Sequence, residues 1–110
     1  MAIDNSLYDS LENTYTEMKD YFNNIQLGRE HSAMIVKHEE LAELLETLDI
    51  EAIEEQWPDI NALHKELDNI NEHAKKILDD LNAGGDSVAI AEKVVNDLDE
   101  IFSKIAKLIV

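Results

Sequence analysis

One segment of the chain repeats its apolar residues at alternating intervals of three and four. The positions are Ile60, Leu63, Leu67, Ile70, Ala74, Ile77 and Leu81. This spacing places them on one face of an α-helix, and such a face is stable in water only when it packs on another element. We therefore predict a helix over residues 58–82 that packs against neighbouring helices.

Two earlier segments carry a similar spacing. Residues 5–26 place Tyr8, Leu11, Tyr15, Met18, Phe22 and Ile25 on one face, and residues 30–48 do so with Met34, His38, Leu41, Leu45 and Leu48. Two asparagines and Gly28 lie between these segments and weaken a helix. Two alternatives stay open: a break near Gly28, or one long helix over residues 4–48.

The last segment, residues 87–109, carries two apolar stripes. The first stripe contains Ala91, Val94, Leu98, Ile101, Ile105 and Leu108, and the second contains Val88, Val95, Phe102 and Ile109. A face this wide is more than one neighbouring helix covers. This helix is therefore either the central element of the bundle or a surface for another chain, which would allow a homodimer.

Turn signals separate the third helix from the second. Asp49 is a typical N-cap residue, and we expect it to begin a short helical turn over residues 50–56. Pro58 disfavours helical geometry at Trp57, the residue before it, and is itself suited to a first helical turn. The main helix is therefore predicted to begin at Pro58.

The glycine pair at 84–85 is expected to end that helix, because glycine readily adopts the left-handed conformation of helix ends. Three glycines and one proline in 110 residues favour long helices. The sequence thus predicts an all-α fold, an antiparallel bundle of three to four helices over about 5–26, 30–48, 58–82 and 87–109. Residues 1–110 are expected to form a single domain.

Composition excludes several classes of protein. The chain has no cysteine, which excludes disulfides, thiolate metal sites and cysteine nucleophiles. Its first residues lack the features of a secretory signal, and no segment approaches the ~18 apolar residues of a membrane-spanning helix. We therefore expect a cytoplasmic protein. The net charge of −16 argues against direct binding to nucleic acid or an anionic membrane, which both require lysine and arginine.

Most of this charge comes from residues 39–63, which we call the acidic block. The block holds nine acidic residues and neither lysine nor arginine, whereas the residues before it contribute only −3 and those after it −4. Glu39 and Glu43 are four residues apart, and such a like-charge pair on a helix costs about 0.2–0.5 kcal/mol. The block is either ordinary solvated surface or a dedicated docking surface for a basic partner.

The histidines do not indicate a metal site. His64 and Asp68 are four residues apart and supply at most half of one, and no histidine has a glutamate three residues before it, as di-iron bundles require. We expect the histidines to flank the core and reach solvent or a carboxylate. The serines lack a glycine-flanked turn, and no glycine-rich phosphate loop is present. We therefore expect neither metal, cofactor nor catalytic activity.

His73 and Lys76 form a pair that resembles the histidine-phosphotransfer domains. Those domains are acidic four-helix bundles in which the phospho-accepting histidine is followed by lysine three residues later. The resemblance implies that His73 accepts a phosphoryl group. The family places glycine directly after the lysine, whereas this chain has Ile77.

Trp57 is the only tryptophan and lies within the acidic block. A large side chain at a helix junction is commonly a plug that closes the end of a bundle. An exposed tryptophan in a charged rim is instead typical of a binding hot spot. The sequence favours the plug and leaves the anchor as the alternative.

These observations favour a small interaction protein (an adaptor, escort chaperone or inhibitor) that binds a basic protein surface or a client segment through its acidic helix junction. The candidate partner-binding residues are Glu43, Glu46, Glu51, Glu54, Glu55, Trp57 and Asp59. Two alternatives are an inhibitor that mimics DNA to block a nucleic-acid-binding protein and a phosphotransfer domain acting through His73.

Overall fold

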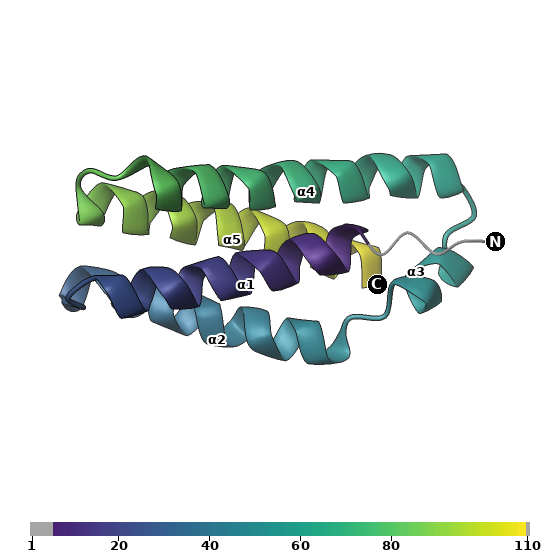
Figure 1. Ribbon diagram of the computed structural model, residues 1–110. Helices are drawn as coiled ribbons and strands as arrows, with labels where there is room; N and C mark the ends of the chain where they lie inside the picture. The colour runs from purple at the N-terminus through teal and green to yellow at the C-terminus, as the bar shows by residue number, and fades with distance from the viewer. Residues whose placement is uncertain (1–5, 110) are drawn as a thin grey trace.

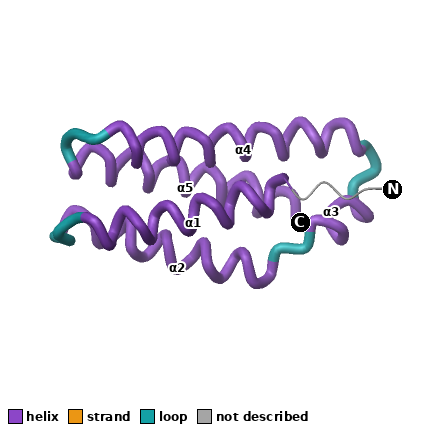
Figure 2. Tube along the Cα trace, viewed as in Figure 1, coloured by secondary structure: helices purple, strands orange, loops and turns teal. Residues whose placement is uncertain are grey.

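Five α-helices and one short 3-10 helix make up the secondary structure of residues 6–109, which the computed structural model describes (Figure 1). They are α1 (Ser6–Asn24), η1 (Arg29–His31), α2 (Ser32–Thr47), α3 (Ile50–Gln56), α4 (Ile60–Ala83) and α5 (Ser87–Ile109). No strand occurs in this range (Figure 2). The prediction of an all-α fold is confirmed.

The predicted count of three to four helices is wrong, because the segment expected as a short helical turn is a separate helix, α3. Asp49 begins it as predicted: its carboxylate accepts a hydrogen bond from the backbone N–H of Ala52 at 3.1 Å. Trp57 ends it in extended geometry, as expected for a residue that precedes proline. The four long helices lie close to their predicted ranges. The prediction that the main helix begins at Pro58 is wrong, because Asp59 is the N-cap in extended geometry and α4 begins at Ile60.

α1 and α2 are two helices and not one long helix. α1 ends at Asn24, and a turn followed by η1 leads into α2. The backbone N–H of His31 donates to the Gly28 carbonyl at 3.1 Å, while the Gly28 N–H donates to Nδ1 of the His31 ring at 3.0 Å. The break near Gly28 is therefore held by a pair of hydrogen bonds to the histidine that follows it.

The four long helices form two antiparallel hairpins, α1 with α2 and α4 with α5 (Figure 1). The hairpins join through α1 against α4 and through α2 against α5, and the helices in each of these two pairs run in the same direction. The predicted antiparallel arrangement therefore holds within each hairpin but not between the hairpins. α2 and α4 are consequently not neighbours. The connection between them crosses the end of the bundle, and α3 forms that crossing.

The core is built from the apolar spacing of the sequence. In α4, six of the seven predicted positions are buried, from Leu63 to Leu81. Ile60, the seventh, is 37% exposed at the first residue of the helix. The spacing thus identifies the inward face correctly, and the exception lies where the helix begins beyond its neighbours.

α5 packs against two long helices, α4 and α2, so most of its two apolar stripes is used inside the bundle. All six residues of its first stripe are buried. In the second stripe, Val95 and Phe102 are half-buried and pack against the core, and only Val88 and Ile109 near the helix ends are largely exposed. α4 and α2 together therefore cover most of the wide face.

An aromatic cluster joins α1 to α2. The His38 ring stacks on Tyr15 with 4.1 Å between centroids and meets Phe22 edge-on at 5.2 Å. Its Nε2 donates a hydrogen bond to the Tyr15 carbonyl at 2.9 Å. These contacts make His38 a structural residue of the α1–α2 interface. Tyr21 lies beside Phe22 in the same cluster, and burial raises the pKa of its phenol above the ordinary value.

Lys37 connects α2 to α5. Its ammonium forms ion pairs with Asp99 of α5 and with Glu40 of its own helix, and it lies 5.6 Å from the centroid of the Phe102 ring. The hydrogen bond with Asp99 is the main cause of a raised pKa at Lys37. Lysine charge, aromatic face and carboxylate therefore act together at one helix contact.

We expect Leu98→Ala to lower the free energy of unfolding by about 2–5 kcal/mol, because removal of the fully buried side chain leaves a cavity in the core beside α5. Ile109→Ala, at a position that is 54% exposed in the same helix, should change it by less than about 0.5 kcal/mol. Urea unfolding followed by circular dichroism measures both. Equal effects would contradict the assignment of the two positions.

Lys37→Met should remove an alkaline-sensitive contribution to stability. A raised folded-state pKa means that the stabilisation is complete below the ordinary lysine pKa of 10.5 and is lost as pH rises through the folded value. The difference in unfolding free energy between wild type and variant, at most about 1 kcal/mol near neutral pH, should thus shrink at high pH. Lys19→Met, at an exposed position without an ion pair among residues 6–109, should show no such trend.

Candidate functional site

The acidic block lies at one end of the bundle, where α2 ends, α3 crosses and α4 begins (Figure 1). We call residues 43–59 the α3 junction. Ile50 and Ile53 are 5% exposed and fix the inner side of α3 on the core. The same short helix therefore turns its apolar side to the core and its charged residues outward.

Trp57 packs at the end of the bundle, as a plug would, and its side chain remains partly exposed. Its indole N–H donates a hydrogen bond to the backbone carbonyl of Leu108, near the end of α5, at 3.1 Å. The side chain is half-buried and packs against the core. It also lines a surface hollow with Gln56, Pro58 and Asp59. The ring closes the bundle and remains partly accessible.

The acidic residues of the block have different surroundings. Asp49 and Asp59 are N-caps, and Oδ1 of Asp59 accepts from the backbone N–H groups of Asn61 and Ala62 at 3.1 and 3.2 Å. Glu40 pairs with Lys37. None of the five candidate glutamates forms an ion pair with another residue of the range 6–109, and all are exposed except the half-buried Glu54. These five are Glu43, Glu46, Glu51, Glu54 and Glu55.

Two of these glutamates lie where a helix disfavours negative charge. Glu46 is in the last turn of α2 and Glu43 is one turn before it, and no basic residue occupies that last turn. The C-terminal end of a helix carries partial negative charge, so cations there stabilise and anions destabilise. The junction thus holds uncompensated charge at a cost in stability.

The structure brings the predicted residues together in part. Glu51, Glu54 and Glu55 share α3, and Trp57 and Asp59 follow directly. Glu43 and Glu46 lie on α2, across the turn at residues 48–49. The Trp57–Leu108 hydrogen bond was not predicted, since nothing in the local sequence indicates which helix end the indole contacts.

The other histidines divide between core and surface. His31 is only 1% exposed and does not reach solvent, but its Nδ1 lies 3.9 Å from Oε1 of Glu30, so it reaches a carboxylate as expected. Its Nδ1 also accepts the hydrogen bond from the Gly28 N–H, and its Nε2 has no hydrogen-bond partner among residues 6–109. His64 is exposed, as expected. A turn that needs the ring at its centre is the physical reason that His31 is buried.

His73 lies on the other hairpin seam, between α4 and α5. Its Nδ1 is 3.3 Å from Oδ1 of Asp97, so it reaches a carboxylate as expected. The contact with Asp97 was not predicted. Its position in the sequence indicates the contact, because His73 and Asp97 each lie 12 residues from Gly85 at the centre of the hairpin and therefore face each other across it.

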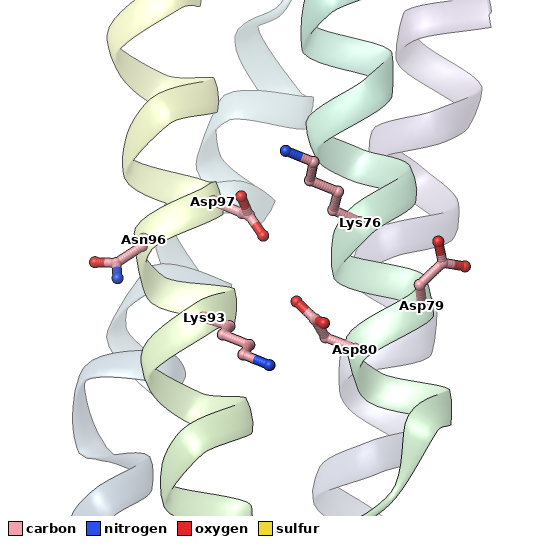
Figure 3. Close-up of a pocket in the computed structure, with 6 residues that line it drawn as sticks. All are labelled: Lys76, Asp79, Asp80, Lys93, Asn96 and Asp97. Carbon is pink, nitrogen blue, oxygen red and sulfur yellow. The ribbon is translucent and has the colours of Figure 1, made fainter.

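A shallow hollow next to this pair has a volume of about 420 Å³ (Figure 3). Its lining mixes charges: Lys76, Asp79 and Asp80 come from α4, and Lys93, Asn96 and Asp97 come from α5. In Figure 3 Lys93 of α5 and Asp80 of α4 extend toward each other. Lys76 of α4 and Asp97 of α5 lie next to each other one step further along the same two helices. This arrangement is typical of complementary charges along an antiparallel helix pair.

Within residues 6–109, no group of three or more His, Cys, Asp or Glu side chains is arranged to hold a metal ion. No helix in that range is both long and apolar enough to cross a membrane. Comparison of the chain with protein-family models, curated proteins and solved structures gives no significant match in any of the three. The α3 junction is therefore the feature of the described residues from which we derive a function.

We expect Glu46→Lys to raise the free energy of unfolding by about 0.3–1 kcal/mol, because a cation complements the C-terminal end of α2 and relieves repulsion with Glu43. Glu12→Lys makes the same change in net charge on an exposed position of α1 and should stabilise less. Thermal unfolding at low ionic strength measures both. Equal gains would show that only net charge matters, and a loss at Glu46 would contradict the analysis.

Proposed function

We propose that this protein is a non-catalytic interaction module whose α3 junction docks a basic surface or client segment of another protein. It would act as an adaptor, an escort chaperone or an inhibitor. The partner-binding residues would be the five unpaired glutamates together with Trp57 and Asp59. A basic partner would neutralise charge that the protein itself leaves unpaired.

One observation carries this proposal: five glutamates without ion pairs in the described range surround a half-buried tryptophan that is fixed by its own hydrogen bond. Binding hot spots combine an ordered aromatic side chain with a polar rim. In the α4–α5 seam, by contrast, acidic residues and lysines line the same hollow. The junction differs from ordinary solvated surface in having no base.

The homodimer through α5 has less support than the junction. Val95 and Phe102, at the middle of the second stripe, pack against the core. The exposed residues of the stripe, Val88 and Ile109, lie near opposite ends of α5 and do not form a continuous face. A hetero-partner at the junction therefore fits the available surface better.

The two alternative functions also have less support. A DNA mimic needs acidic residues in rows over its surface, whereas nine of the 25 acidic residues of this chain lie within residues 39–63, which contain no lysine or arginine. For phosphotransfer, the His73 side chain is only 22% exposed and its Nδ1 contacts Asp97, a negative group that would repel an approaching phosphoryl donor. Incubation with a phosphodonor remains the direct test for an acid-labile phosphohistidine.

The proposal predicts a localised response to a basic probe. Titration of ¹⁵N-labelled protein with a short lysine-rich peptide should shift backbone amide signals mainly in residues 43–59. The triple variant Glu51→Gln, Glu54→Gln and Glu55→Gln should weaken binding roughly tenfold, which corresponds to about 1.4 kcal/mol. Raising the salt concentration should weaken the wild-type complex, because the interaction is electrostatic.

A matched control separates the junction from general acidity. Glu12→Gln, Asp68→Asn and Glu72→Gln remove the same number of negative charges from exposed positions on α1 and α4. This variant should bind nearly as tightly as wild type. Equal weakening by both triple variants, or amide shifts spread over all helices, would overturn the proposal.

A further inference from the structure

The hollow beside Trp57 has a lining that defines the chemistry of an occupant. It measures about 310 Å³ and is formed by Gln56, Trp57, Pro58 and Asp59. The planar indole of Trp57 and the aliphatic ring of Pro58 supply apolar surface, and the side-chain amide of Gln56 and the carboxylate of Asp59 supply hydrogen-bond acceptors. A side chain that fits must therefore combine a flat apolar face with hydrogen-bond donors at its edge.

The walls of this hollow are ordered before any ligand arrives. The Trp57 indole is held by its hydrogen bond to Leu108, and the backbone N–H of Trp57 donates to the Ile53 carbonyl at 3.2 Å. The proline that follows has a restricted backbone. A ligand would therefore lose little free energy in ordering the site.

Asp59 is oriented in the same way. Its Oδ1 accepts two backbone N–H groups at the start of α4, and Oδ2 accepts no hydrogen bond from another residue of the described range. Glu54 and Glu55 precede Trp57 by three and two residues, and residues 39–63 contain no lysine or arginine. The charge complementary to this hollow is positive.

We infer that the hollow binds an arginine side chain of the basic partner. A guanidinium is planar, stacks on aromatic faces and donates hydrogen bonds from its edge to a carboxylate, whereas a lysine ammonium has no flat face and is more strongly hydrated. Arginine is also enriched in binding hot spots. This inference rests on the proposed function and names the residue that would anchor the partner.

Trp57 reports on this site directly, because it is the only tryptophan of the chain. Three lysine-rich peptides of equal length should be titrated against the full protein while its fluorescence is recorded; they differ at one central position, which is arginine, lysine or leucine. We expect the arginine peptide to bind about three- to ten-fold more tightly than the lysine peptide. It alone should change the Trp57 emission strongly.

A pair of cap variants isolates the hollow. Asparagine is as good an N-cap as aspartate, so Asp59→Asn keeps the start of α4 while removing the charge from the hollow. Asp49→Asn makes the same change at the N-cap of α3, outside the hollow. Asp59→Asn should abolish the preference for arginine over lysine, and Asp49→Asn should retain it.

The possible failures are distinguishable. If the arginine and lysine peptides bind equally and leave the emission unchanged, the arginine site is overturned while the acidic docking surface stands. Tighter binding of the leucine peptide would overturn it in favour of an apolar anchor. If no peptide binds the junction, both the inference and the proposed function fail.

Discussion

The wide apolar face of α5 is the feature on which the rest of the bundle depends. Its first stripe is buried throughout and the middle of its second stripe packs against the core, which one neighbouring helix cannot achieve. α5 therefore needs its hairpin partner α4 on one side and α2 from the other hairpin on the second side. α1 then completes the bundle by contacting both α2 and α4.

This arrangement makes the α3 junction necessary. Because α2 and α4 are not neighbours, the chain between them must cross the end of the bundle and close it. Ile50 and Ile53 are buried by that crossing, and the Trp57 indole is tied to the last turn of α5. The same crossing leaves the opposite side of a short helix in solvent, and this side carries the glutamates. Fold and candidate site therefore have a common origin.

The distribution of charge separates structural from candidate functional residues. Lys37 has carboxylates from two helices and an aromatic ring as neighbours, and Asp49 caps α3. Asp59 belongs to both groups, because it caps α4 and also lines the hollow beside Trp57. The glutamates of the junction have no comparable role, and Glu46 lies at a helix end that disfavours its charge. Proteins generally retain such costs at sites used for binding, where stability and function compete.

The sequence by itself determined the helices, the inward faces of α4 and α5, and the cap at Asp49, because periodicity and capping are local properties of the chain. It also located the acidic block, Trp57 and the short helical segment at residues 50–56, but not the burial of His31 or the contacts of Lys37 with Asp99, His73 with Asp97 and Trp57 with Leu108. Only the tertiary structure decided these. Each of these contacts depends on which helices are neighbours and on how far they are shifted along their axes relative to one another. Side-chain packing between segments distant in sequence fixes both.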